Sequence, residues 1–203
     1  MYTRKQVDAR AIAEAGISLI ELVLFIAVVS VGIAGILTAM NVVTRRSADP
    51  MIQKQALAIA EAVLEEVMLM PFTFCDPNDP VAETAAAGGC TTGMDQSNGG
   101  GSFTGPIPGT ETRYNASNPF DNVADYAGFS MTGGIFDITS GGTTPIAGLG
   151  NYRLQPITIA RIDNLPNVPT DAAVLITVTV TDPSGQNIVL QGVRTRYAPN
   201  TLP

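Results

Sequence analysis

The chain has 203 residues, a formal net charge of -7, and neither histidine nor tryptophan. With 18 acidic and 11 basic residues, the sequence has no basic stripe to displace counterions from phosphates, so we expect no nucleic-acid partner. Because histidine is the usual general base and a usual zinc ligand, we expect neither an enzyme nor a bound metal or cofactor.

An apolar stretch lies near the N-terminus. From Leu22 to Met40 the nineteen residues carry no charge, and only Ser30 and Thr38 are polar. As a helix this run spans about 29 Å, close to the ~30 Å hydrocarbon thickness of a bilayer. A signal peptide is the main alternative, but its apolar region is shorter and needs a small-residue cleavage site, which is missing after this run. We expect a retained anchor with its N-terminus inside.

The next segment has a different periodicity. After Asp49-Pro50 the apolar residues recur at spacings of three or four, which predicts an amphipathic helix ending at Pro71. Asp49 is the expected N-cap and Pro50 the first helical residue, so either one long helix kinks at Pro50 or two helices meet there. The apolar stripe comprises Ile52, Ala56, Ile59, Val63, Val67 and Met70.

Residues 75–112 are rich in glycine and proline, which predicts a long surface loop or a partly disordered segment that buries little apolar surface. If this segment lies outside the cytoplasm, Cys75 and Cys90 are expected to form a disulfide, and two free thiols are the alternative. Asp76, Asn78 and Asp79 resemble calcium ligands, but no EF-hand pattern follows them, so no calcium site is predicted.

The C-terminal part of the sequence favours β-structure. Residues 126–138 predict a loop with a short strand, and residues 152–160 predict a strand that is irregular at Pro156. Residues 174–180 and 188–193 predict a β-hairpin around the turn Asp182-Pro183-Ser184-Gly185. The amphipathic helix is expected to cover the apolar face of this hairpin, which gives an α+β fold.

The segment Gly16-Ile17-Ser18-Leu19-Ile20-Glu21-Leu22, followed by the apolar run, resembles the start of the type IV pilin and pseudopilin family. The family pattern is Gly, usually Phe, then Thr-Leu-Ile-Glu, so Ile17 and Ser18 depart from it. Within the family the chain is most similar to minor pilins of the mannose-sensitive haemagglutinin (MSHA) pilus, MshD type. Residues 49–56, 60–67, 120–126 and 178–196 carry that closer similarity.

The resemblance implies a pilin-like fold and a division of the chain into five regions. These are a cytoplasmic leader (1–16) that is removed, a transmembrane and assembly half-helix (17–44), an amphipathic half-helix (45–71), a Gly-rich variable loop (72–113) and a β-rich globular region (114–203). A prepilin peptidase would cut between Gly16 and Ile17 and then N-methylate Ile17.

The resemblance also gives Glu21 a role. An ionised carboxylate in an apolar environment is costly unless it is paired. Glu21 is therefore expected to pair with the new cationic amine of Ile17 in an adjacent subunit. The alternative is a glutamate near the membrane interface that reaches the headgroups.

The implied function is that of a minor pilin, a fimbrial subunit incorporated in, or priming assembly of, a type IV pilus used in cell adhesion. Its expected partners are other pilin subunits, the prepilin peptidase, the inner-membrane assembly platform and the inner membrane itself. The protein would span the bacterial inner membrane once, with a periplasmic C-terminal domain, and then enter the pilus on the cell surface. The alternatives are a type II secretion pseudopilin and a single-pass membrane-anchored periplasmic binding protein.

Overall fold

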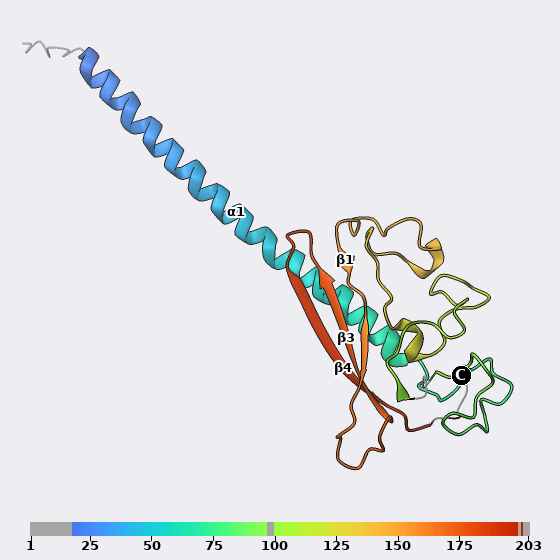
Figure 1. Ribbon diagram of the computed structural model, residues 1–203. Helices are drawn as coiled ribbons and strands as arrows, with labels where there is room; N and C mark the ends of the chain where they lie inside the picture. Colours follow the sequence, from blue (N-terminus) through green and yellow to red (C-terminus); the bar gives the residue numbers. More distant parts are fainter. Residues whose placement is uncertain (1–17, 97–99, 199, 201–203) are drawn as a thin grey trace, which may run out of the picture. The chain divides into compact units, whose positions relative to one another are not determined.

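The computed structural model describes residues 18–96, 100–198 and 200, and its fold is α+β (Figure 1). The chain divides into two units, Met1–Ala48 and Asp49–Pro203. Gly16 and Ile17, the predicted processing site, lie outside the described residues, as does the predicted leader.

One helix, α1, runs from Leu19 to Leu69 over 51 residues, with Pro50 inside it. The expectation that Asp49 caps a new helix is therefore wrong, as is the alternative of two helices meeting at Pro50. The predicted kink stays a prediction. Helix α1 ends two residues before Pro71, because proline lacks the N–H that a further helical turn needs and disfavours helical geometry in the residue before it.

The unit Asp49–Pro203 contains a four-stranded antiparallel sheet built around β3, Ala173–Thr181. Strand β4, Asn187–Thr195, pairs with β3 along its whole length. On the opposite side of β3, two short strands share one edge: β1, Arg153–Leu154, and β2, Thr158–Arg161. The sequence predicted this interrupted strand, because Pro156 lies in the gap between β1 and β2.

The predicted β3–β4 hairpin and its turn are confirmed. The N–H of Gly185 donates to the Asp182 carbonyl at 3.0 Å, and Gly185 has a φ of 87°, which glycine adopts without strain. One carboxylate oxygen of Asp182 accepts from the backbone N–H groups of Ser184 and Gln186 at 2.8 and 2.9 Å. The aspartate at the start of the turn therefore organises the whole loop.

The short strand predicted within residues 126–138 is wrong. This part of the chain forms only isolated bridges, Met131 to Leu154 and Phe136 to Pro145. Gly134, at a φ of 121°, lies between the two bridges and breaks the extended conformation. Two short 3-10 helices flank the segment: η2, Val123–Tyr126, and η3, Ile138–Ser140.

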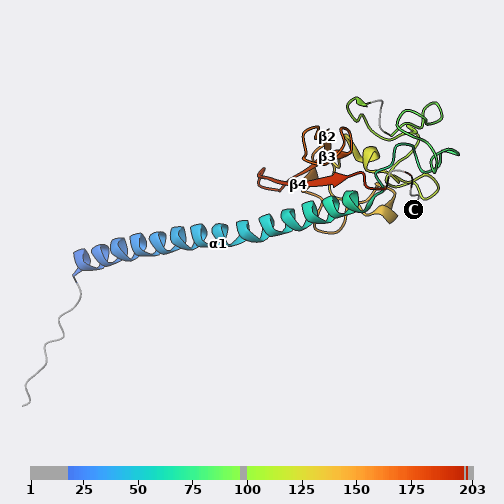
Figure 2. The ribbon, with the colours of Figure 1, turned by 90° about the horizontal axis from the view of Figure 1, so that it is seen from below.

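The core lies between the C-terminal part of α1 and the sheet, as the sequence predicted. Figure 2 shows this part of α1 running alongside β3 and β4. Gly192 of β4 lies so close to the helix that an added Cβ would come within 3.2 Å of Met68 and 3.3 Å of Leu64. The buried side chains that form one cluster across this contact include Ala56, Ile59, Ala60, Val63 and Val67 of α1 and Val174, Ile176, Val178 and Val180 of β3.

The prediction that residues 75–112 form a long loop is confirmed, because the segment folds as irregular turns and bends. Its apolar burial is small, as predicted: Cys75, Ala82 and Ala85 form a second apolar cluster. Several polar side chains of the segment are also buried, namely Asp76, Asp79, Gln96 and Glu111. These loops lack the regular backbone hydrogen bonds of a helix or a sheet. A disulfide and side-chain hydrogen bonds hold them in place instead.

Candidate functional site

Helix α1 begins with a segment that has the length and composition to cross a membrane. Leu19–Asn41 comprises 23 residues with a mean hydropathy of 2.6. None of its most apolar stretch of 18 residues is buried inside the protein. At 1.5 Å per residue the segment is about 35 Å long, against ~30 Å for the hydrocarbon layer. Soluble monomers rarely expose so large an apolar surface, and lipid or another chain is the kind of environment that covers one.

The two hydroxyl groups inside this segment are satisfied by the helix itself. Ser30 donates to the Ile26 carbonyl at 2.6 Å, and Thr38 donates to the Ala34 carbonyl at 2.8 Å. Such bonds to the preceding turn remove the cost of placing a hydroxyl in an apolar environment. Both residues are therefore compatible with lipid on every side of the helix.

Glu21 lies in the first turn of α1, where the positive end of the helix dipole favours a carboxylate. Its side chain is exposed, and its backbone N–H donates to the Ser18 carbonyl at 3.0 Å. The spacing Ser18-x-x-Glu21 is also that of a capping box. The helix start therefore accommodates a carboxylate at this position without requiring one. Its predicted partner, the amine of Ile17, lies outside the described residues and stays a prediction.

The predicted disulfide is confirmed. Cys75 and Cys90 are bonded, with their Cα atoms 5.4 Å apart. Asp79 closes the same loop, since its carboxylate accepts from the backbone N–H and the hydroxyl of Thr91 at 2.8 and 2.7 Å. The two sulfurs and Asp79 lie together, but bonded cysteines offer no thiolate to a metal.

Beyond the disulfide, four carboxylates come together in what we call the acidic cluster: the buried Asp76, Glu111 and Asp125, and the half-buried Asp121. Oxygens of the first three lie within 4.8 Å of one another. The amide of Gln96 donates to Asp76 at 3.2 Å and to Asp125 at 3.0 Å, which places the fourth carboxylate beside the others. None of the four forms an ion pair with an arginine or lysine of the described residues.

Asp125 is the structural member of the acidic cluster. Besides Gln96, it accepts from the backbone N–H groups of Ile107, Asp121 and Asn122 at 3.2, 3.2 and 2.8 Å. Its bond to Asn122 is half of a capping box that starts the 3-10 helix η2. Burial still raises the pKa of Asp125, although these donors act to lower it.

Glu111 is the opposite case. Its side chain is only 2% exposed, and neither carboxylate oxygen has a hydrogen-bond donor within the described part of the chain. Burial, together with the negative charges of Asp125, Asp121 and Asp76, raises the pKa of Glu111 to about 9. Burial and the charge of Asp76 likewise raise the pKa of Asp121 to about 7. The cluster concentrates negative charge that the neighbouring side chains leave unneutralised.

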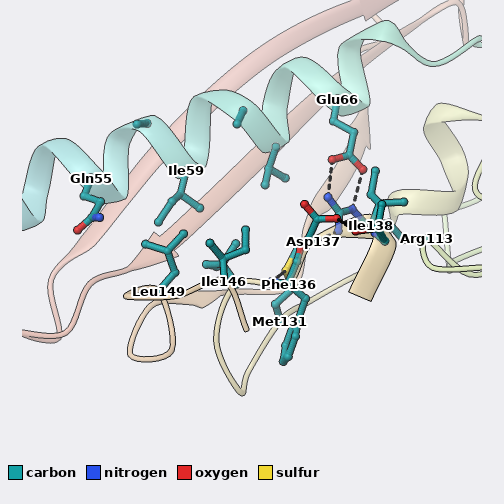
Figure 3. A pocket seen from close by; sticks show the side chains of 15 residues that line it. Gln55, Ile59, Glu66, Arg113, Met131, Phe136, Asp137, Ile138, Ile146 and Leu149 are labelled. Carbon is teal, nitrogen blue, oxygen red and sulfur yellow. Dashed lines mark hydrogen bonds and ion pairs between the residues drawn. The ribbon is translucent and has the colours of Figure 1, made fainter. Parts of the chain in front are cut away.

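A second charged site, the Glu66–Arg113 pair, is fully satisfied. Arg113 meets both oxygens of Glu66 at 2.7 Å and donates to the Phe136 carbonyl at 3.1 Å (Figure 3). The hydroxyl of Tyr126 donates to Glu66 at 2.8 Å. Burial acts to lower the pKa of Arg113, but Glu66 outweighs it, so this pKa is raised and Arg113 stays cationic.

The Glu66–Arg113 pair closes one end of an apolar groove of about 680 Å³ between α1 and residues 131–149 (Figure 3). Ile59 of the helix faces Ile146 and Leu149 across it. Both charges at its end are occupied by each other, so the groove offers an apolar surface rather than a polar binding site. Its size suits a few side chains or a small apolar ligand.

Comparisons with protein-family models, with curated protein sequences and with solved structures find no match for this chain. The sequence pointed to Glu21, Cys75 and Cys90, and the structure brings the two cysteines together. Of the residues that resembled calcium ligands, only Asp76 contributes a carboxylate to the acidic cluster, whereas Asn78 donates to Asp121 at 3.0 Å. Glu111 was missed, because no local pattern links it to Asp76.

Proposed function

We propose that this protein is a non-enzymatic subunit of a type IV pilus, a minor pilin of the MSHA type with a pilin-like fold. The observation that carries the proposal is a carboxylate, Glu21, in the first turn of a helix whose next nineteen residues carry no charge and are exposed. Processed at Gly16–Ile17, the protein would be held in the inner membrane and later packed among other subunits.

The exposed apolar half of α1 suits both the membrane-anchored subunit and the subunit packed in a filament. Each large apolar side chain described between Leu19 and Val43 is at least 38% exposed, so the helix is apolar on all sides. Lipid covers such a helix in the membrane, and the helices of neighbouring subunits cover it by the same contacts in a filament. A single-pass anchor needs only the first of these environments and has no use for Glu21.

Glu21 supplies the selectivity that apolar packing lacks. Cleavage after Gly16 would create a cationic amine at Ile17, and an amine about 4 Å from the carboxylate gains about 4 kcal/mol at an effective dielectric near 20, before desolvation is subtracted. A subunit docked in the wrong register would leave Glu21 unpaired. The pair therefore favours one register over its neighbours.

The disulfide supports a location outside the cytoplasm for the unit Asp49–Pro203, since such bonds persist in oxidising compartments. Helix α1 contains both the apolar segment Leu19–Asn41 and residues of the core of this unit. One helix therefore carries both the membrane anchor and part of the folded unit. Both features support a subunit that is made in the inner membrane and displayed on the pilus.

The first test is processing. The full chain is co-expressed with a prepilin peptidase, and mass spectrometry of the product is expected to find an N-methylated Ile17 at the new N-terminus. Gly16→Val should abolish cleavage, because a β-branched side chain blocks close approach to the backbone. Gly32→Val is the matched control, since a side chain there meets open space. An uncut chain, or a cut elsewhere, contradicts the proposal and favours a membrane-anchored binding protein.

The second test is assembly. Glu21→Gln should be cleaved normally but should enter sheared filaments far less than the wild type, because the amide cannot neutralise the amine. Glu65→Gln, an exposed position on the same helix, should assemble normally. Equal amounts of Glu21→Gln and wild type in filaments would show that the carboxylate is dispensable. Loss of protein secretion with intact pili would instead identify a type II secretion pseudopilin.

A further inference from the structure

We propose that the acidic cluster is a calcium site, in which Asp76, Glu111 and Asp121 bind one Ca²⁺. The proposal goes beyond the function proposed above and does not depend on it, because every step concerns the folded unit Asp49–Pro203 alone. It also differs from the sequence expectation of no metal, which rested on the absence of histidine and of an EF-hand pattern after Asp76, Asn78 and Asp79.

The distances fit one cation. Two oxygens bound to the same Ca²⁺ are separated by at most twice the Ca–O distance, which is about 4.6 to 5.2 Å. The oxygens of Asp76, Glu111 and Asp121 all lie within 4.8 Å of one another. A single ion can therefore contact all three carboxylates with small side-chain adjustments.

The state of the oxygens is the observation that points to a ligand. Both oxygens of Glu111 and one oxygen of Asp121 are buried and have no hydrogen-bond donor among the described residues. Glu111 is 2% exposed, so water cannot solvate it in the way it solvates a surface glutamate. A buried acceptor without a partner costs about 1–3 kcal/mol, and more if it is charged. A cation bound by the carboxylates removes this cost.

The side-chain amide of Gln96, beside the acidic cluster, also has an oxygen that lacks a hydrogen-bond donor among the described residues. Gln96 is completely buried and uses its NH₂ group to bridge Asp76 and Asp125, and it also donates to the Ile107 carbonyl at 2.7 Å. Its own carbonyl oxygen, Oε1, is buried without a donor. Acceptors thus outnumber donors around the cluster, which is the pattern expected where the missing partner is a cation.

The donor set selects calcium among the common metals. All three ligands are carboxylates and no histidine exists in the chain, so zinc and copper lack the nitrogen and sulfur ligands they prefer. Mg²⁺ requires a near-octahedral shell and retains several waters, whereas Ca²⁺ accepts irregular sets of six to eight oxygens. Ligands carried by irregular loops, with oxygens at unequal spacings, favour Ca²⁺.

The surroundings hold the ligands before any ion arrives. Asp125 is fixed by three backbone donors and orients Gln96, which in turn fixes one oxygen of Asp76. The N–H of Asn78 fixes the other oxygen of Asp76 at 2.7 Å, and its side chain holds Asp121 at 3.0 Å. Calcium would therefore connect the disulfide-bonded loop to the segments that carry Glu111 and Asp121.

The experiment titrates Ca²⁺ into the purified full chain in a non-ionic detergent, after EDTA treatment and removal of the chelator. Calorimetry should detect one saturable Ca²⁺ per chain, with a dissociation constant in the micromolar to millimolar range of known sites. Calcium should also raise the thermal unfolding midpoint, and Mg²⁺ at the same concentration should raise it less. The probe is the metal alone.

The variant Glu111→Gln keeps the shape of the side chain and removes its charge, so its metal-free form should fold. Its calcium affinity should be at least about tenfold lower, and Asp121→Asn should be weakened in the same direction. Glu83→Gln, an exposed acid in the disulfide-bonded loop, is the control and should bind like the wild type. Absence of saturable binding at several millimolar Ca²⁺, or equal affinity in wild type and Glu111→Gln, would overturn the proposal.

Discussion

Glu66 and Glu111 both place a carboxylate inside the unit Asp49–Pro203, but their surroundings differ. Glu66 meets Arg113 through two bonds of 2.7 Å and also accepts from Tyr126. Glu111 meets other acids, and its oxygens have no donor within the described residues. The Glu66–Arg113 pair is neutralised by the chain itself, whereas the acidic cluster must take up either protons or a cation.

The difference shows which part of the fold depends on solution conditions. The Glu66–Arg113 pair joins α1 to the segments at Arg113 and Phe136, and its arginine stays charged at any ordinary pH. In the acidic cluster the carboxylates repel one another when they are ionised, so the stability of this region depends on pH and on bound cations. Four predictions test this contrast.

The largest effect is expected for Arg113→Met, which keeps the length of the side chain and removes its charge. Glu66 would then remain as a half-buried carboxylate with Tyr126 as its hydrogen-bond donor. Removing one partner of a fully buried pair costs about 3–5 kcal/mol, so a loss near the lower end of this range is expected. Urea unfolding of the full chain in detergent measures the loss. Arg153→Met, at an exposed position of β1, should change stability by less than about 0.5 kcal/mol. Equal small effects would show that the pair adds little.

The next effect concerns the disulfide, which supports the acidic cluster and not the Glu66–Arg113 pair. Replacing both Cys75 and Cys90 by serine removes a cross-link over 15 residues, which should cost about 3 kcal/mol through the greater entropy of the unfolded chain. The reduced wild type is the control and should unfold at the same urea concentration. If calcium binding survives unchanged in the double variant, the loop does not need the cross-link to hold Asp76.

The sequence predicted the helix, the hairpin and the disulfide of the unit Asp49–Pro203 well. The α1 stripe and the β3–β4 hairpin follow from apolar periods of 3.6 and 2, and the turn at Asp182 from its residue types. The disulfide followed from two cysteines in a loop that was expected to lie outside the cytoplasm. Each of these signals is local, or involves two residues of a rare type.

Local sequence signals do not predict the acidic cluster or the continuation of α1 through Pro50. Asp76, Glu111 and Asp121 lie on separate loops, and only the folded chain brings them together. At Asp49-Pro50 the cap signal was real but was outweighed. A proline inside a helix costs about 3 kcal/mol, whereas ending the helix there leaves several backbone groups unpaired at each new end. Local signals fail where tertiary contacts or helix continuity set the outcome.

The third prediction is a pH dependence of the calcium-free protein, measured in EDTA. Folding raises the pKa of Asp121 to about 7 and that of Glu111 to about 9, above their ordinary values of 3.8 and 4.5. Stability from these acids is therefore full below their unfolded pKa values near 4 and falls as the pH rises, by up to about 1.4 kcal/mol per pH unit for each acid. The loss is complete near pH 7 for Asp121 and near pH 9 for Glu111. The double variant Asp121→Asn, Glu111→Gln should flatten the profile. Stability that rises over this range would contradict the prediction.

The smallest effect is expected for Asn78→Ala, which removes the one side chain that donates to Asp121, at 3.0 Å. The bond is exposed and its acceptor is a carboxylate, so its loss should cost about 0.5–1.5 kcal/mol in EDTA at pH 8. The pKa of Asp121 should rise further, because the Asn78 hydrogen bond acts to lower it.

Asn118→Ala is the matched control for this last change, since its side chain donates to the neutral hydroxyl of Thr110 at 3.1 Å, also at an exposed position. Bonds to neutral acceptors are weaker, so this variant should lose less stability and should leave the pH profile unchanged. If both asparagine variants lose the same stability at pH 8, Asp121 carries no charge there. A proton rather than the chain would then neutralise this part of the acidic cluster in the absence of calcium.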